Sequence, residues 1–465
     1  MFETVALPVW ALLLILGFAA VAAVDRVLGP GLRWFLRRRM ERAVARLNAR
    51  LDRPIEPFKL LERQDTVNRV LYSPEVMQAV QEHARTEGIP EEVVFAKARR
   101  YAREIVPGFS TAAYFGFATR VARLLSRAFY RVRLGAYDEK AISAIDHEAT
   151  VIFVMNHRSN MDYVLVTYLV AERSALAYAV GEWARVWPLR SLVRALGGYF
   201  IRRRSRNPLY RRVLSRYVQL SAANGVTQAM FPEGGLSLDG RVGPAKLGLL
   251  SYVLQGFDPA RDRDVVFVPI GINYDRVIED RVLVKAQDTG TRAFRVSIRR
   301  ALWVAARHLL QRVSGRFHRF GYAAVSFGAP VSLRTVMAEN GGRIDVGHLG
   351  DLLTGRVRDI VPVLPVPLVA AVLAGAEGPM PRAAIVAEAG RLRTALAAQG
   401  AHVHLPRDDP DYEVTVGLRG LVARGVLRET AEGYEVAPGE DALLRFYANS
   451  VLQLVHRDQA PPAAT

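Results

Sequence analysis

A histidine and an aspartate five residues apart are the best-placed pair for proton transfer in this chain. His157 and Asp162 lie in the polar segment NHRSNMD, residues 156–162. A neutral imidazole can take the proton of an alcohol when a carboxylate bonds to its other nitrogen, fixes the tautomer and stabilises the imidazolium that forms. Because the chain contains no cysteine, a thiol nucleophile is excluded. The pair therefore predicts a general base that acts directly on a hydroxyl group, without a covalent intermediate.

The same residues also allow a purely structural interpretation. Ser159 and Asp162 fit the S-x-x-D capping box, in which Asp162 only closes the start of a helix. His157 would then be an ordinary loop histidine. The spacing alone leaves both interpretations open.

A strand, a loop and a helix are expected to position this pair. Residues 151–155 form an unbroken apolar run typical of a buried strand, and residues 161–170 are apolar again and predicted to be helical. Further strands are predicted over residues 175–179, 198–201, 227–231, 265–270 and 323–327. Their alternation with helices predicts an α/β fold, a mostly parallel sheet flanked by helices. His157 would lie at the carboxyl end of its strand, where such sheets bind ligands.

Cations and a proline mark the ends of two other predicted strands. The segment GGYFIRRR ends in Arg202, Arg203 and Arg204. One or two of these arginines could clamp a phosphate bidentately, while the others would be solvated surface charge. Pro269 is expected to end its strand near the same pocket, because proline is unfavourable inside a central strand.

A glycine-rich loop with two cations follows the strand at 227–231. Glu233, Gly234 and Gly235 would let the backbone turn sharply or approach a ligand closely. Arg241 and Lys246 follow in the same loop and could present positive charge to an anion. An ordinary turn with surface charges is the alternative interpretation.

The net charge and the N-terminus indicate an anionic partner. The chain has 465 residues and a formal net charge of +18, which favours nucleic acid, an anionic membrane surface or phosphorylated substrates as partners. Residues 5–24 carry no charge and match the length of a transmembrane helix. Arginines follow this stretch, so the bulk of the chain is expected on the cytoplasmic side. A buried core helix is the alternative for residues 5–24.

The chain divides into five predicted parts. They are a transmembrane anchor (1–25), a basic juxtamembrane and helical region (26–130), a catalytic domain (131–360), a C-terminal module (361–458) and a disordered tail (459–465). The C-terminal module is expected to contain helices over 381–399, 411–424 and 439–456 and a strand pair over 426–436, as in a winged helix. The prolines at 362, 365 and 367 mark its start. No zinc-ligand cluster, Walker loop or dinucleotide fingerprint occurs, so no metal or cofactor is expected.

Four segments together resemble the glycerolipid acyltransferase superfamily. They are NHRSNMD, GGYFIRRR, FPEGG…GR…P-x-K-x-G and VPIGINYDRVIE, in this order over about 150–280. They are most similar to the glycerol-3-phosphate and dihydroxyacetone-phosphate acyltransferase branch, which FYANSVLQL near the C-terminus also resembles. The order and content of all four blocks make this signal far more specific than any single block.

The resemblance implies transfer of an acyl group from acyl-CoA or acyl carrier protein to the sn-1 hydroxyl of glycerol 3-phosphate, which gives lysophosphatidate. It implies that His157 is the general base and Asp162 the carboxylate that orients it. The residues expected to bind substrate are Arg158, Ser159, Arg202, Arg203, Glu233, Gly234, Gly235, Arg241, Lys246 and Pro269. The expected location is the cytoplasmic face of the inner (plasma) membrane, with a single span, anionic lipids as partners and no nucleic acid.

One departure from the family pattern concerns the acceptor. The family usually has an arginine directly after Glu-Gly-Gly and often a second one two residues on, but this chain has Leu236 and Leu238. Dihydroxyacetone phosphate or a lysophospholipid is therefore an alternative acceptor. A non-enzymatic basic protein that binds membranes or nucleic acid is a second class, although no aromatic-interleaved basic surface supports it.

Overall fold

The computed structural model describes residues 8–11, 15–16, 38, 42, 44–170, 174–181, 189–202, 205–289, 320–404 and 406–455. These residues belong to two compact units, Met1–Pro54 and Ile55–Thr465. Most of the stretch 5–24, both Arg203 and Arg204, and the tail 459–465 lie outside the described residues. Of the helices that the structure does describe, none combines the length and the apolar character needed to cross a membrane. The transmembrane prediction therefore receives no support from the described residues.

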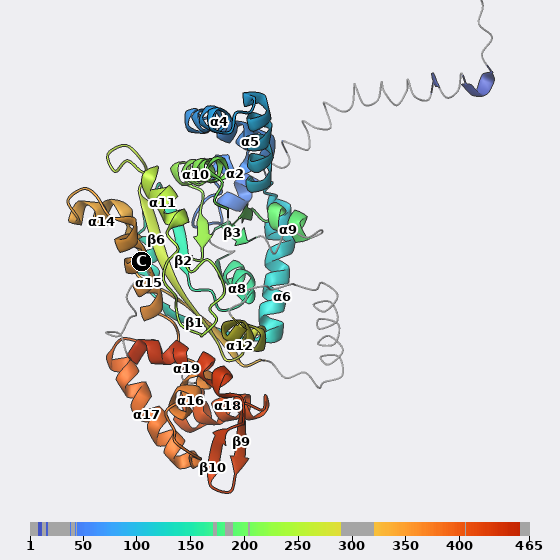
Figure 1. Ribbon diagram of the computed structural model, residues 1–465. Coiled ribbons are helices and arrows are strands. Elements are labelled where there is room, and N and C mark those ends of the chain that lie inside the picture. The colour runs from blue at the N-terminus through green and yellow to red at the C-terminus, as the bar shows by residue number, and fades with distance from the viewer. Residues whose placement is uncertain are drawn as a thin grey trace, which may run out of the picture. The chain divides into compact units, whose positions relative to one another are not determined.

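An eight-stranded sheet lies at the centre of the second unit (Figure 1). Its strands are β1 (Arg131–Tyr137), β2 (Thr150–Met155), β3 (Ala177–Gly181), β4 (Tyr199–Ile201), β5 (Gln228–Met230), β6 (Val265–Tyr274), β7 (Tyr322–Phe327) and β8 (Val331–Ser332). The strand order is β1-β7-β6-β2-β5-β3-β4, and β8 pairs with β6. Only the pairs of β6 with β7 and with β8 are antiparallel. The predicted α/β fold with a mostly parallel sheet is confirmed, although β1 and β8 were not predicted.

Helices before, between and after the strands complete this unit. Those before β7 are α2 (Pro57–Leu60), α3 (Arg63–Leu71), α4 (Pro74–Glu87), α5 (Glu91–Ile105), α6 (Thr119–Phe129), α7 (Glu139–Ser143), α8 (Met161–Val170), α9 (Leu189–Ala195), α10 (Pro208–Ala223), α11 (Gly248–Gln255) and α12 (Asp280–Thr289). Those that follow are α14 (Leu333–Glu339), α15 (Val346–Asp359), α16 (Pro365–Leu373), α17 (Arg382–Ala398), α18 (Pro410–Val422) and α19 (Asp441–Val455). A π-helical turn, Ala112–Ala118, leads into α6.

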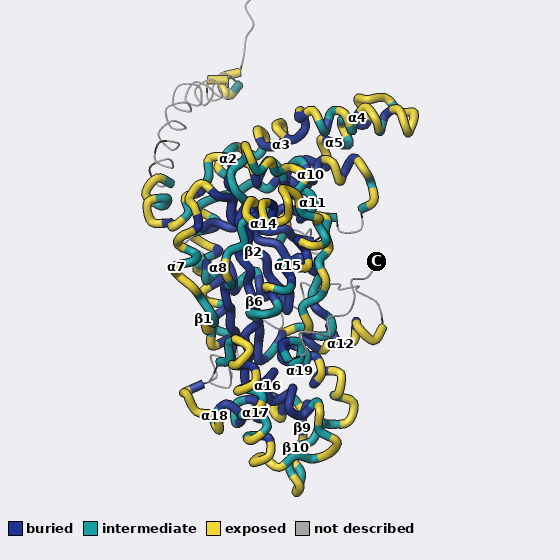
Figure 2. The backbone as a smooth tube through the Cα atoms, turned by 90° about the vertical axis from the view of Figure 1, so that its left-hand side faces the viewer, coloured by how far each residue is buried: buried dark blue, intermediate teal, exposed yellow. Residues whose placement is uncertain are grey.

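Both faces of the sheet are covered by helices, as the central strand β2 shows. Val151, Phe153 and Met155 pack into one hydrophobic cluster, which includes residues of α8, α16 and α19. Ile152 and Val154 pack into a second cluster, with residues of α3, α4, α5, α10 and α15. Alternate side chains of a strand point to opposite faces, so β2 is apolar from Val151 to Met155 and buried along its whole length (Figure 2). Its carboxyl end is thereby fixed between two packed layers.

Pro269 lies inside β6 and does not end it, so the prediction that it closes a strand is wrong. The strand continues to Tyr274, and Pro269 pairs with Val154 of β2. On its other side β6 pairs with β8 up to Phe267 and with β7 from Ile270 onwards. Pro269 therefore occupies the gap between two antiparallel partners, where a missing backbone N–H breaks no ladder bond.

The C-terminal segment contains the predicted helices and strand pair. The helices α17, α18 and α19 match the predicted ranges, and β9 (Leu427–Thr430) and β10 (Gly433–Val436) form an antiparallel pair. The wholly buried helix α16 was not predicted; it begins at Pro365, a position where proline is tolerated. One hydrophobic cluster continues from the sheet into α16 and α19. The C-terminal helices therefore share a core with the strands of the central sheet.

Candidate active site

His157 and Asp162 are held together at the carboxyl end of β2. The ring atom Nδ1 of His157 lies 2.9 Å from Oδ2 of Asp162, and both side chains are buried. The imidazole stacks on Phe231, with ring centroids 4.0 Å apart, and meets the edge of Tyr163. Among the residues that the structure describes, no group bonds to Nε2. Because the carboxylate accepts from Nδ1–H, the neutral ring keeps its lone pair on Nε2, as a general base requires.

Asp162 serves the helix and the histidine at the same time. Its Oδ2 also accepts hydrogen bonds from the backbone N–H groups of Arg158 (2.8 Å) and Ser159 (3.0 Å). The Oγ of Ser159 accepts from the N–H of Met161, so the capping box predicted as the alternative is present. The Oδ1 of Asp162 accepts from the hydroxyl of Tyr274 at 2.7 Å. The two interpretations of the sequence are therefore compatible, since one carboxylate closes the helix and orients the imidazole.

Glu233 and Ser237 fix the backbone of His157 from the third block. Oε1 of Glu233 accepts from the N–H of His157 at 2.9 Å, and Oε2 accepts from the N–H of Gly243 at 3.1 Å. The N–H of Ser237 donates to the carbonyl of His157. Burial raises the pKa of Glu233 to about 8, although its two backbone hydrogen bonds act in the opposite direction. Glu233 is thus a positioning group for His157 in this structure.

The fourth block ties down the same loop through residues that sequence reasoning did not single out. Glu279 accepts from the hydroxyl of Ser159 at 2.8 Å and from the backbone and side-chain N–H groups of Asn160. The side chain of Asn156 makes two hydrogen bonds to the backbone of Ile272 in β6. Polar side chains at the ends of apolar strands were the available signal for Asn156, Tyr274 and Glu279.

Three predicted cations occupy different environments around this loop. Arg158 is 1% exposed, donates to the carbonyl of Gly240 and lies over the ring of Phe446 in α19. Its Nε and Nη2 have no hydrogen-bond partner among the described residues, and burial lowers its pKa. Arg241 and Lys246 are exposed. The side chain of Lys246 runs beside Gly234, where an added Cβ would lie 2.8 Å from its Cδ.

The remaining predicted residues are placed as follows. Gly234 has φ +65°, a conformation that favours glycine, in the turn shared with Gly235. Leu236 and Leu238 are half-buried and pack against the hydrophobic cluster. Pro269 is buried within β6. Arg202 forms a bidentate ion pair with Glu104 of α5, at 2.8 and 2.6 Å, so its guanidinium is already engaged away from His157.

The helix α19 contacts the third block through polar side chains of FYANSVLQL. The Nδ2 of Asn449 donates to the carbonyl of Asp239 at 2.9 Å, and Oε1 of Gln453 accepts from the N–H of Val242 at 2.8 Å. Ser450 accepts from Asn273 of β6. The C-terminal helix is therefore part of the support of the site.

The fold and the site show a His–Asp pair at the carboxyl edge of an α/β sheet, and two segments of the chain match acyltransferase families. Residues 138–273 match the Acyltransferase family, and residues 306–458 match the glycerol-3-phosphate acyltransferase C-terminal region. Both matches support the glycerol-3-phosphate acyltransferase branch that the four sequence blocks resemble.

Similar proteins named glycerol-3-phosphate acyltransferase occur in several bacteria. The chain is 35% identical to the one from Pseudoalteromonas atlantica over 47% of its own length and 27% of the relative. It is 30% identical to the one from Alteromonas mediterranea, over 59% and 32%. The chain thus spans about a third or less of the length of these relatives. A 1-acyl-sn-glycerophosphate acyltransferase structure from Thermotoga maritima matches with 21% identity and a TM-score of 0.29, over 51% of this chain and 78% of that one.

Proposed function

We propose that the protein transfers a fatty acyl group from a thioester to the sn-1 hydroxyl of glycerol 3-phosphate and forms lysophosphatidate. The observation that carries this proposal is the Nδ1–Oδ2 hydrogen bond of 2.9 Å between His157 and Asp162. The match of residues 306–458 to the glycerol-3-phosphate acyltransferase C-terminal region supports the choice of acceptor. The donor would be acyl-CoA or acyl carrier protein, and no metal or resident cofactor takes part.

The reaction follows from the tautomer of His157. Nε2 takes the proton of the acceptor hydroxyl while the oxygen attacks the thioester carbonyl. The tetrahedral intermediate then collapses, the carbon–sulfur bond breaks, and the imidazolium returns the proton to the leaving thiolate. Asp162 stabilises the imidazolium in both steps. The products are the ester and the free thiol, and the enzyme is unchanged.

The acceptor phosphate requires cations that the third block does not supply at its usual positions. Two guanidinium nitrogens of Arg158 have no hydrogen-bond partner among the described residues, and Lys246 is exposed beside the Glu233 turn. We assign the phosphate contact to these two residues.

We place the protein at the cytoplasmic face of the cell membrane, because residues 5–24 are uncharged and arginines follow them.

A second acceptor class is favoured by one observation. Leu236 and Leu238 pack against the hydrophobic cluster that also contains Phe231, where the family pattern has arginines. Such apolar lining suits a lysophospholipid better than a small dianion. Dihydroxyacetone phosphate is the other alternative, since it differs from glycerol 3-phosphate only at the central carbon.

An acceptor screen tests the proposal directly. The full chain in detergent would receive acyl-CoA or acyl carrier protein thioester with glycerol 3-phosphate, dihydroxyacetone phosphate or lysophosphatidate, and products would be identified by mass. We expect lysophosphatidate from glycerol 3-phosphate, and no product with His157→Ala. If only lysophosphatidate gave a product, it would be the acceptor in place of glycerol 3-phosphate. Turnover that survives in His157→Ala would refute the mechanism.

A further inference from the structure

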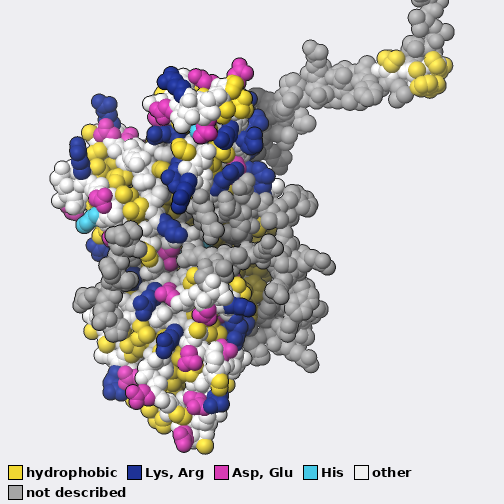
Figure 3. All heavy atoms as spheres, in the orientation of Figure 1, with side chains coloured by type: hydrophobic (Ala, Val, Ile, Leu, Met, Phe, Trp, Pro, Cys, Tyr) yellow, Lys and Arg dark blue, Asp and Glu magenta, His cyan; other side chains and the backbone are white. Residues whose placement is uncertain are grey.

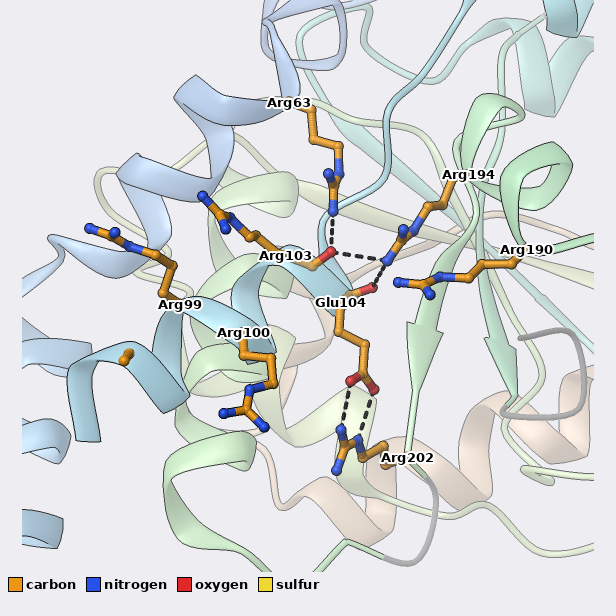
Figure 4. A pocket seen from close by; sticks show the side chains of 9 residues that line it. Arg63, Arg99, Arg100, Arg103, Glu104, Arg190, Arg194 and Arg202 are labelled. Carbon is orange, nitrogen blue, oxygen red and sulfur yellow. Dashed lines mark hydrogen bonds and ion pairs between the residues drawn. The ribbon is translucent and has the colours of Figure 1, made fainter. Parts of the chain in front are cut away.

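A pocket distinct from the loop around His157 is lined mainly by arginines, seven in all, with one glutamate and one alanine. The pocket encloses about 710 Å³, and Figure 3 shows Lys and Arg side chains gathered over α5 and α9. Its lining residues are Arg63, Ala96, Arg99, Arg100, Arg103, Glu104, Arg190, Arg194 and Arg202 (Figure 4). They come from α3, α5, α9 and the end of β4. Its volume lies within the range of small-molecule sites, about 300–1,000 Å³.

Three of these arginines have structural partners. Arg63 and Arg194 both donate to the carbonyl of Arg103, and Arg194 also donates to that of Glu104 (Figure 4). They thereby satisfy free carbonyls at the C-terminal end of α5. Arg202 is paired with Glu104. Helix capping and one ion pair therefore account for Arg63, Arg194 and Arg202.

The other four arginines have no such explanation. Arg99, Arg100, Arg103 and Arg190 have no acidic partner within the part of the chain that the structure describes, and all four are exposed. Burial, together with repulsion from Arg190 and Arg103, lowers the pKa of Arg63. Gathering like charges around a hollow destabilises the folded protein unless an anion neutralises them. Guanidinium groups bind phosphate bidentately.

The sheet register separates this pocket from the His157 site. The connection between the two runs through the residue pairs Val154–Met230, Ala229–Tyr178 and Ala179–Tyr199. His157 lies three residues after Val154 of β2, and Arg202 lies three residues after Tyr199 of β4. The two residues are therefore at the same height along the sheet, with β5 and β3 between their strands. Three strand spacings amount to about 14 Å. A three-carbon acceptor is too short to present its hydroxyl to His157 and its phosphate to this pocket.

We propose that the arginine pocket is a second anion site, which binds a group carrying several phosphate charges. Two sources have this chemistry: the nucleotide end of CoA, with its diphosphate and 3′-phosphate, and the headgroups of anionic phospholipids. CoA carries its phosphates at the end of a long flexible arm from the thioester sulfur, so it could reach both sites from one edge of the sheet. The link to the donor rests on the proposed function, but the anion site itself does not.

Binding measurements on the full-length protein test the site without relying on turnover. The test variant is Arg100→Ser/Arg103→Ser/Arg190→Ser, which leaves the helix-capping arginines and the Arg202–Glu104 pair in place. The matched control is Arg261→Ser/Arg343→Ser/Arg391→Ser, which removes the same charge from exposed positions elsewhere. The probes are CoA, dephospho-CoA, and vesicles of phosphatidylglycerol or phosphatidylcholine.

We expect the test variant, but not the control, to bind one phosphate probe about tenfold or more weakly than the wild type. Weaker CoA binding, with a smaller effect on dephospho-CoA, identifies CoA as the source. Weaker binding to phosphatidylglycerol vesicles alone identifies lipid headgroups. Equal binding of all probes by the test and control variants would overturn the site.

Kinetics separate this site from the proposed reaction. If CoA is the ligand, the test variant should raise the KM for acyl-CoA about tenfold and leave the KM for acyl-pantetheine, which lacks the nucleotide, unchanged. An equal rise for both thioesters would refute a role for the phosphates in donor binding. Absence of turnover in the wild type would refute the proposed function and leave the binding result intact.

Discussion

Tyr274 donates a hydrogen bond of 2.7 Å to Oδ1 of Asp162, the oxygen that does not contact His157. Burial raises the pKa of Tyr274 well above its usual value, so the hydroxyl stays a donor throughout the physiological range. Tyr274 comes from the last position of β6, and Asp162 from the first turn of α8. The carboxylate is therefore held from two elements, and its orientation toward the imidazole depends on both.

Tyr274→Phe should lower kcat while the protein stays folded. The substitution removes a hydrogen bond to a charged group, worth about 1.5–3 kcal/mol, and so about 10- to 100-fold in rate if the carboxylate loses its orientation. Steady-state kinetics with acyl-CoA measure the effect. Tyr199→Phe is the matched control, because Tyr199 is equally buried and its hydroxyl has no hydrogen-bond partner among the described residues. Similar kcat values for the two variants would contradict the prediction.

Asp162→Asn separates the two roles of that carboxylate. An asparagine can still accept from the N–H groups of Arg158 and Ser159, so we expect a loss of about 1–3 kcal/mol in the free energy of unfolding. The amide cannot stabilise the imidazolium, and kcat should fall about 10³- to 10⁴-fold. Urea unfolding and turnover of the same preparation give both quantities.

Asp345→Asn is the control for helix capping alone. Asp345 caps α15 through the N–H groups of Gly347 and His348, and no histidine ring depends on it for orientation. It should lose little stability and no turnover, because asparagine caps a helix about as well as aspartate. If Asp162→Asn kept its kcat within tenfold of the wild type, the capping role alone would explain Asp162.

Asn449→Ala and Gln453→Ala should weaken the support that α19 gives to the third block. Each removes one hydrogen bond to the backbone of the loop at Asp239 and Val242, worth about 1 kcal/mol. We expect kcat/KM to fall about fivefold for each variant, with the melting temperature only slightly lower. Asn340→Ala is the control, since among the described residues Asn340 donates only to carbonyls of its own helix α14. Equal activity of all three variants would show that the contact is merely structural.

The elements that hold the site were predictable where local pattern is strong. Strand β2 is six buried residues in a row, and the loop after it combines His157 with Asp162, so an apolar run and a polar turn were enough. The same pattern failed at β1, a strand whose arginines are exposed at the sheet edge. It also failed at Pro269, because residue preferences do not predict that β6 changes its partner strand from β8 to β7 at this position.

Contacts between segments that are far apart in the chain could not be predicted from the sequence. Arg202 was expected at the acceptor, but its partner Glu104 is 98 residues earlier in the chain. The contact between Gln453 and Val242 joins residues 211 positions apart. Spacing within a block carries no information on such pairs. The block therefore identified Arg202 as a candidate residue but did not predict which pocket it lines.

Asp275 should make stability fall as the pH rises. Its carboxyl oxygens accept from the N–H groups of Tyr322 and Val366, and burial raises its pKa from 3.8 to about 7. Between these values the folded protein keeps a proton that the unfolded chain has lost, so the stabilisation is full below about pH 4 and is lost as the pH rises through about 7. In Asp275→Asn this titration is absent. The free energy of unfolding of the wild type minus that of the variant, measured in urea, should therefore decrease over this pH range. A difference that stays constant or increases would show that Asp275 is ionised in the folded protein, held by its two backbone donors against the cost of burial.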